Sequence, residues 1–331
     1  MLKNKKIILS LDKLIINSKD ILIEKLKIYF KEVNYIYGSE RLKKEEGFYI
    51  KVLKELSKKR YIKKYINSLL DKENLKYYNK IISNFLDTDY VLMIGGIYYS
   101  KEFINLVKKN NPKIKFILFL WDKFEKEKIT ELKKYYDILY TFEKNDAFEN
   151  NIYWRPSFYI FEKDNCEKKI DFYFLGENRD KIRYEYINKL YKFCLKNSLK
   201  SNINLYSKKK LKNYNKNIII YKKIPYEENV NNIKHSRVTF EKNINNQDGL
   251  SLRSLECLGY RTKLITTNKD IKNYDFYNPK NIFIVEKIED IDKIPISFFK
   301  EKYENLEKEI LKKYSFEGFI EEIFKIRGKI K

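Results

Sequence analysis

The sequence predicts an α/β protein with two doubly wound, parallel-sheet domains. Short apolar stretches with strand character alternate with stretches of helical periodicity along most of the chain, which is the pattern of such sheets. Residues 114–120, IKFILFL, form a continuous apolar run of the kind that a parallel sheet buries on both faces. A chain of 331 residues is long enough for about two domains.

The first half of the chain contains the expected elements of one such domain. Helices are expected from Ser18 to Phe30, in the Lys- and Tyr-rich region from Gly47 to Phe85, and after Ser100, which is suited to cap its helix. Asp122 follows an apolar strand and precedes a short helix. The strands are expected at Lys6–Leu11, Val33–Tyr37, Tyr90–Gly96, Ile114–Leu120 and Asp137–Phe142.

The second half repeats the alternation after a polar boundary. Trp154–Pro156 and the run from Glu162 to Lys169 mark that boundary, so we expect domains at residues 1–160 and 161–331. Helices are expected after Asp180, from Pro225 to Ile233, and in the segment from Phe298 to Ile326. The strands are expected at Ile170–Gly176, Asn204–Tyr206, Ile218–Tyr221, Val238–Phe240, Lys263–Thr266 and Ile282–Val285.

The stretch from Arg237 to Asn268 is the centre of the functional interpretation. A strand is followed by a polar loop, by a helix over 250–258 that Gly259 is expected to end, and by another strand. In such units ligands bind beyond the carboxyl end of the strand, against the helix N-terminus. The backbone amides of Gly249 and Leu250 are therefore candidate donors to a phosphate group.

Two charged residues of this helix are candidate ligand contacts. Glu256 has two interpretations that the sequence leaves open: a solvated helix position, or a carboxylate that accepts the two hydroxyls of a ribose. Arg253 lies one turn earlier and is suited to a charge-assisted contact with a diphosphate.

Asp248 and Glu256 are separated by seven residues, GLSLRSL. This spacing resembles the motif of two acids in GT-B glycosyltransferases, although the first acid here is Asp rather than Glu. The string GLSLRSLECLG…KLITTN…YDFY is similar to the C-terminal half of bacterial transferases that build lipopolysaccharide and capsule. The string VLMIGG…NPKIKFILFLWD…YYDILYTFEKNDA is similar to their N-terminal half, so the resemblance covers the chain from about Asp89 to Tyr277.

The resemblance implies a GT-B fold, in which two Rossmann-like domains face a central cleft. The C-terminal domain would bind the nucleotide-sugar donor, with Glu256 on the ribose and the loop at Asp248 facing the sugar. Asp248 would then be a candidate catalytic residue. Gly176 would lie beside the diphosphate and Arg179 would contact it, unless Arg179 is a surface residue opposite an acid. The N-terminal domain would bind the acceptor, and the final helix would cross back to it.

Asp122 is the candidate base for the acceptor hydroxyl, because it should emerge at the carboxyl end of its sheet. The alternative is that it only caps the following helix. We expect no metal and no cofactor besides the donor substrate. Basic groups and a helix N-terminus can neutralise the leaving diphosphate, and the acidic pair at Asp87 and Asp89 precedes a strand rather than following one.

The chain is strongly basic, with a formal net charge of +24. A biased, AT-rich genome would explain this; attraction to anionic membranes, phosphate-bearing substrates or nucleic acid is the functional alternative. Nucleic acid is the least expected partner, because the basic residues are spread along the chain and no recognition motif is present. One candidate membrane surface is a helical face with the basic residues Lys54, Lys58, Lys59, Arg60, Lys63 and Lys64.

The three cysteines show no metal-binding spacing, and the sequence has no apolar run of about 20 residues. We expect no signal peptide, because Asp12 and Lys13 interrupt the N-terminal apolar run and no small-residue cleavage site follows. We therefore expect a cytoplasmic protein, with peripheral attachment to the inner face of the membrane as an open alternative. The predicted function is a metal-independent glycosyltransferase of the hexosyltransferase type, acting on a cell-surface glycan or lipid-linked acceptor. The alternatives are a nucleic-acid-binding protein and a catalytically inactive, transferase-like binding protein.

Overall fold

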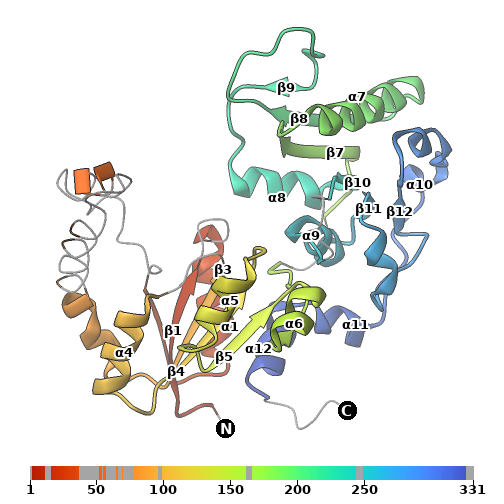
Figure 1. The fold of residues 1–331 in the computed structure, drawn as a ribbon. Coiled ribbons are helices and arrows are strands. Elements are labelled where there is room, and N and C mark those ends of the chain that lie inside the picture. Colours follow the sequence, from red (N-terminus) through yellow and green to blue (C-terminus); the bar gives the residue numbers. More distant parts are fainter. Residues whose placement is uncertain are drawn as a thin grey trace. The chain divides into compact units, whose positions relative to one another are not determined.

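A computed structural model describes residues 2–11, 16–36, 78–95, 99–161, 166–243 and 249–325, with a few isolated residues between 52 and 76 (Figure 1). The basic face from Lys54 to Lys64 and the candidate residue Asp248 lie outside these residues. The chain divides into two compact units, residues 1–155 and 156–331, so the observed boundary falls before the one expected at 160.

Unit 1 is built around a six-stranded sheet in which every neighbouring pair is parallel. Side chains such as Phe116 and Leu118 pack with helices α4 (Lys101–Asn110) and α5 (Lys126–Leu132) on one face, while Leu9 and Leu92 are equally buried on the other. In sheet order the strands are β2 (Glu32–Tyr35), β1 (Lys6–Leu11), β3 (Tyr90–Gly95), β4 (Lys115–Leu120), β5 (Ile138–Thr141) and β6 (Tyr153–Trp154). The described helices of this unit include α1 (Lys19–Lys27), α4 (Lys101–Asn110), α5 (Lys126–Leu132) and α6 (Lys144–Asn150).

Helix α4 starts where its sequence predicts. The Ser100 hydroxyl accepts a hydrogen bond from the Phe103 amide, 3.3 Å away, which satisfies one of the free donors of the first turn. The apolar residues Phe103, Ile104 and Val107 then lie on one side of the helix and are fully buried. Their spacing is that of a single helix face, which is why periodicity predicts this helix well.

Unit 2 has a second six-stranded, all-parallel sheet. In sheet order its strands are β12 (Ile282–Ile284), β11 (Lys263–Thr266), β10 (Ser236–Glu241), β7 (Ile170–Glu177), β8 (Ser201–Tyr206) and β9 (Ile219–Ile220). Its described helices include α7 (Lys181–Lys196), α8 (Tyr226–Lys234), α9 (Leu252–Tyr260), α10 (Ser297–Lys300), α11 (Lys308–Lys313) and α12 (Phe316–Ile323). The expected fold class, α/β with two doubly wound parallel sheets, is therefore confirmed.

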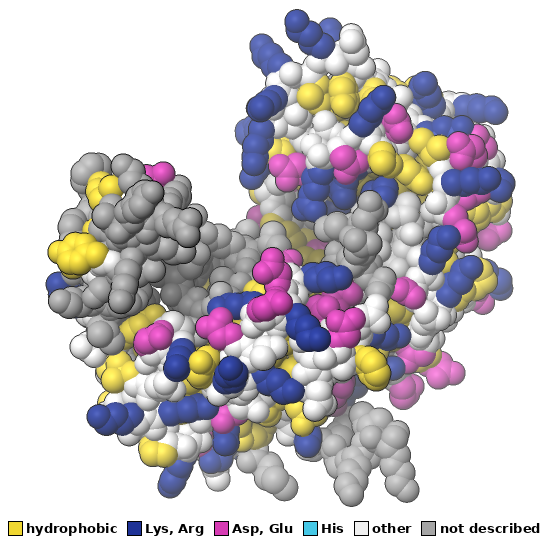
Figure 2. Space-filling view, viewed as in Figure 1, with side chains coloured by type: hydrophobic (Ala, Val, Ile, Leu, Met, Phe, Trp, Pro, Cys, Tyr) yellow, Lys and Arg dark blue, Asp and Glu magenta, His cyan; other side chains and the backbone are white. Residues whose placement is uncertain are grey.

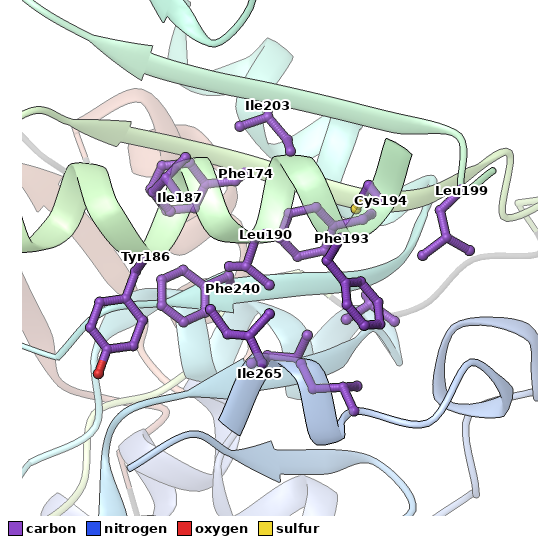
Figure 3. Close-up of a cluster of buried hydrophobic side chains, with 14 of the residues drawn as sticks. Phe174, Tyr186, Ile187, Leu190, Phe193, Cys194, Leu199, Ile203, Phe240 and Ile265 are labelled. Carbon is purple, nitrogen blue, oxygen red and sulfur yellow. The ribbon is translucent and has the colours of Figure 1, made fainter. Parts of the chain in front are cut away.

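The two faces of this second sheet are covered by different helices. Helix α7 inserts Ile187, Leu190 and Phe193 among strand residues such as Phe174 and Phe240 (Figure 3). On the opposite face, the buried side chains of α9 join those of β11 and α11 in a separate core cluster. Strand side chains alternate between the faces, so β7 contributes Phe172 and Phe174 to the first cluster and Tyr173 to the second.

The end of α9 differs from the prediction. Gly259 does not end the helix, which continues to Tyr260 and is closed by Arg261 in the left-handed conformation, at φ 54°. Gly259 is required instead for close packing, because a Cβ atom there would lie 2.5 Å from the Phe161 carbonyl oxygen and 2.9 Å from the Tyr159 ring.

Candidate functional site

The strand order of unit 2 reverses direction between β7 and β10. From β7 the chain proceeds to β8 and β9 on one side, and it returns at β10 on the other side of β7. The loops that follow β7 and β10 therefore lead to helices on opposite faces, α7 and α9. Open α/β sheets bind their ligands at such a point, so we examined the side chains there first.

The N-terminus of α9 is one wall of this region. Ser251 caps the helix, and its hydroxyl accepts from the Ser254 amide at 3.3 Å. Gly249 and Leu250 precede the cap and are both buried, and the side chain of Asn268 donates to the Gly249 carbonyl at 3.5 Å. The capped first turn leaves backbone N–H groups and the positive end of the helix dipole available to an anion.

Glu256 is buried in the middle of this helix, with only 5% of its surface exposed. The Tyr226 hydroxyl, from the start of α8, donates to its Oε1 atom at 3.0 Å. Burial raises the pKa of Glu256, while the charge of Arg253 and the hydrogen bond from Tyr226 oppose that rise. Of the two interpretations that the sequence leaves open, the solvated helix position is therefore wrong.

Arg183 is a site residue that the sequence analysis missed. It lies in the first turn of α7, and its guanidinium donates to the Lys242 carbonyl at 3.3 Å, directly after β10. The Nε atom of Arg183 is buried and has no hydrogen-bond acceptor among the described residues. Burial lowers the pKa of Arg183, and the nearby charges of Arg179 and Arg253 lower it further.

The two predicted diphosphate contacts, Gly176 near the end of β7 and Arg179 just after it, have different surroundings. A Cβ atom at Gly176 would lie 2.6 Å from the Phe174 ring and 3.5 Å from a guanidinium nitrogen of Arg183, so glycine lets the Phe174 ring and that cation pack closely against the strand. Arg179 itself is exposed. Arg183, rather than Arg179, is the arginine held between the ends of β7 and β10.

Two further cations complete the region. The guanidinium of Arg253 lies over the Phe174 ring, 5.7 Å from its centroid. The ammonium group of Lys242 lies 5.6 Å from the centroid of the Tyr186 ring, and burial lowers the pKa of Lys242. Like charges that are partly shielded from water repel one another, so this group of cations favours the binding of an anion.

Arg183 did carry a signal that could have identified it. It lies three, four and seven residues before Tyr186, Ile187 and Leu190, which form the buried face of α7. An arginine that continues an apolar stripe toward the N-terminus of a helix must place its charge near the sheet edge. Tyr226 had no such signal, because its contact with Glu256 joins α8 to α9.

The two predicted catalytic residues are Asp122 and Asp248. Asp122 is exposed and lies just beyond the end of β4, as expected. It is not the cap of the following helix, because α5 begins at Lys126 with Glu125 in the N-cap position. Its proposed role as a base remains a prediction. Asp248 lies outside the described residues, so its predicted role also remains untested.

Two kinds of feature, membrane spans and metal-binding clusters, are absent from the described part of the chain. No helix there is long and apolar enough to cross a membrane. No group of three or more His, Cys, Asp or Glu side chains there could hold a metal ion.

No protein-family model and no curated protein matches the sequence. Among solved structures, the chain is similar to the S. aureus MnaA–UDP co-structure, with 10% identity over 98% of both chains and a TM-score of 0.49. It is also similar to an α1,3-fucosyltransferase, with 12% identity over 99% of this chain and 92% of that one and a TM-score of 0.48. A third is the UDP-N-acetylglucosamine 2-epimerase from Rickettsia bellii, with 11% identity over 98% and 96% of the two chains and a TM-score of 0.47. We draw no functional conclusion from likeness at this level.

Proposed function

We propose that the protein is a glycosyltransferase of the GT-B type, which transfers a sugar from a nucleotide-sugar donor to a glycan or lipid-linked acceptor. The observation that supports this most is the buried carboxylate of Glu256, one turn after Arg253 on a helix whose capped N-terminus follows β10. A carboxylate accepts the two hydroxyls of a ribose well, because each would form a charge-assisted hydrogen bond.

The donor's diphosphate would bind among the cations at the ends of β7 and β10. Arg183 offers an Nε–H group with no acceptor among the described residues, and its guanidinium lies beside the strand at Gly176. Arg253 and the N-terminus of α9 would add positive charge from the opposite side of β10. When the bond from the sugar to the diphosphate breaks, these groups would stabilise the negative charge that develops, without a metal ion.

Unit 1 would supply the acceptor side. As the acceptor oxygen forms its bond to the sugar, a base takes the hydroxyl proton, and we assign this role to Asp122 at the carboxyl end of β4. The Trp121 ring beside it packs edge-on against Phe119, with ring centroids 6.3 Å apart. The resemblance to lipopolysaccharide and capsule enzymes favours a hexose transferred to a glycan.

A basic surface on unit 2 supports peripheral attachment to an anionic membrane. From Ser207 to Tyr226 the sequence contains no acidic residue, and its lysines, all exposed, are Lys208, Lys209, Lys210, Lys212, Lys216, Lys222 and Lys223. We call these side chains the β8–β9 lysine surface. Figure 2 shows Lys and Arg side chains along the upper rim of the view, where Figure 1 places β9 and the loop from β8. Such a surface attracts anionic lipid headgroups at physiological salt.

The proposal is tested with purified protein and a panel of nucleotide sugars, measuring donor consumption and transfer to glycan acceptors. We expect one donor to be consumed, with release of its nucleoside diphosphate, and the activity to persist when EDTA removes divalent metal ions. Glu256→Gln should abolish most of this activity. A protein that binds no nucleotide sugar but binds duplex DNA would refute the proposal. A protein that binds a donor but never turns it over would be a transferase-like binding protein.

A further inference from the structure

Glu241 is a second buried carboxylate beside the candidate donor site, and the function proposed above does not use it. It is the last residue of β10, with 6% of its surface exposed. The loop to α9 begins directly after it, so it lies where the sheet ends and the site begins. Charged residues are seldom this deeply buried unless they are paired or hydrogen-bonded.

One oxygen of this carboxylate connects three elements at the carboxyl edge of the sheet. Oε2 accepts a hydrogen bond from the Ser254 hydroxyl at 2.6 Å and another from the Thr266 hydroxyl at 3.0 Å. Ser254 belongs to the first turn of α9, between Arg253 and Glu256, and Thr266 is the last residue of β11. Hydrogen bonds to an ionised acceptor are stronger than neutral ones, so this carboxylate holds the first turn of α9 against the sheet.

The other oxygen leaves the carboxylate incompletely satisfied. Oε1 is buried and has no hydrogen-bond partner in the part of the chain that the structure describes. The adjacent residue, Lys242, accepts through its carbonyl from Arg183, whose Nε atom is also buried and also lacks an acceptor there. An anion and a cation thus lie near each other at the edge of β10 without forming an ion pair of 4.0 Å or less within the described residues. Because both groups are partly shielded from solvent, their charges still interact at this distance.

We propose that Glu241 is a positioning residue of the donor site: it fixes the first turn of α9 through Ser254, and it is the counter-charge of the cations around Arg183 while no donor is bound. This inference rests on the proposed function. The two effects of Glu241, positioning α9 and acting as a counter-charge, change ligand affinity in opposite directions. Fixing α9 favours nucleotide binding by holding Arg253 and Glu256 in place, whereas the counter-charge weakens the attraction of Arg183 for phosphate and helps the diphosphate product to leave.

The charge effect is measured with Glu241→Gln, which keeps the shape of the side chain and an oxygen that accepts from Ser254 and Thr266. Using inorganic pyrophosphate as the ligand in titration calorimetry, we expect the dissociation constant to fall about three- to tenfold, as removal of one nearby charge would cause. The matched control is Glu177→Gln, which removes an exposed carboxylate at the end of β7. Exposed charges are screened by salt, so its effect should stay below about twofold.

The positioning effect is measured with Glu241→Asp, which keeps the charge but withdraws the carboxylate from Ser254 by one methylene. Affinity for the best of UDP, GDP, ADP and CDP should then fall about tenfold, equal to the loss of one charge-assisted hydrogen bond. Pyrophosphate affinity should fall by less, because pyrophosphate has no ribose to contact Glu256, and it should not rise as in the Gln variant. Thermal melting checks that each variant folds. In steady-state kinetics, the Glu241→Gln variant should have a lower KM and a lower kcat, because product release slows. The Glu241→Asp variant should have a higher KM.

Unchanged or weaker pyrophosphate binding by a folded Glu241→Gln variant would overturn the counter-charge role. Unchanged nucleotide affinity in Glu241→Asp would overturn the positioning role, and that result can be obtained even if the Gln variant does not fold. Failure of the proposed function looks different: the unmodified protein would then bind none of the nucleoside diphosphates and consume no nucleotide sugar.

Discussion

Glu256→Gln should change stability and nucleotide binding in opposite directions. Burial raises the pKa of Glu256 above its ordinary value of 4.5. A carboxyl group whose pKa is higher in the folded chain stabilises the fold fully below the unfolded pKa, and this contribution is lost as the pH rises through the folded pKa. Glutamine does not titrate. The variant should therefore melt at a higher temperature than the wild type at pH 7, and the difference should disappear as the pH falls toward 4.

The expected loss of nucleotide affinity in Glu256→Gln follows from the number of hydrogen bonds that the substitution removes. A ribose bound through both hydroxyls makes two hydrogen bonds to the carboxylate, each worth about 1.5–3 kcal/mol because the acceptor is charged. Glutamine keeps one oxygen acceptor and replaces the other with an NH₂ group, so about one of these bonds is lost. A loss of this size weakens nucleoside diphosphate binding about ten- to hundredfold.

Both effects are measured on one preparation, with thermal melting between pH 4 and pH 8 and titration calorimetry with a nucleoside diphosphate. Tyr226→Phe is the informative partner variant, because it removes the 3.0 Å hydrogen bond to Glu256 but keeps the carboxylate. It should lower the melting temperature at pH 7. Tyr184→Phe is the control, since that hydroxyl accepts from the Asn215 amide instead. The reasoning is refuted if Glu256→Gln melts below the wild type at pH 7 and still binds nucleotide normally.

Other predictions concern single features of the two units. Asp122→Asn should lose most turnover while donor affinity and melting temperature stay unchanged; near-normal turnover removes it from the catalytic residues. Arg183→Gln should weaken pyrophosphate binding about tenfold and Arg179→Gln less than threefold, because buried charge pairs are screened less; calorimetry giving the reverse order would contradict the site. Gly259→Ala should cost about 1–3 kcal/mol of unfolding free energy by overpacking against Phe161, and unchanged denaturation would contradict this. Neutralising four lysines of the β8–β9 lysine surface should reduce binding to anionic vesicles, and a similar loss on neutral vesicles would argue against attachment by charge. The four are Lys208, Lys209, Lys210 and Lys212.

The strands were the most predictable part of the fold, because a parallel strand that is buried on both faces must be apolar at nearly every position. The sequence predicts β1 at its observed bounds, and β4 begins one residue later than expected. The order of the strands in each sheet could not be derived in this way. It depends on which edges pair, and the apolar runs are too similar to distinguish their neighbours.

Gly259 and Arg183 show where local patterns fail. A glycine near the end of a helical stretch has two common uses, to end the helix or to allow close packing, and only the approach of the Phe161 backbone decides between them. Arg179 is closer in sequence to the end of β7 than Arg183, but the first turn of α7 directs Arg183 toward the sheet and leaves Arg179 exposed. Proximity along the chain was therefore a poor guide to proximity in space.

Glu241 and Glu256 together favour a functional origin for this region. Each carboxylate is buried, and neither forms an ion pair of 4.0 Å or less with a described cation, so each costs the fold stability that an apolar side chain would not. Both are connected to α9: Ser254 of this helix donates to Glu241 at the end of β10, and Glu256 lies on the helix itself and accepts from Tyr226. The nearby cations are likewise partly buried and crowded together. A stable core needs neither feature, whereas a site that binds a ribose and a diphosphate needs both, with the charges fixed before the ligand arrives.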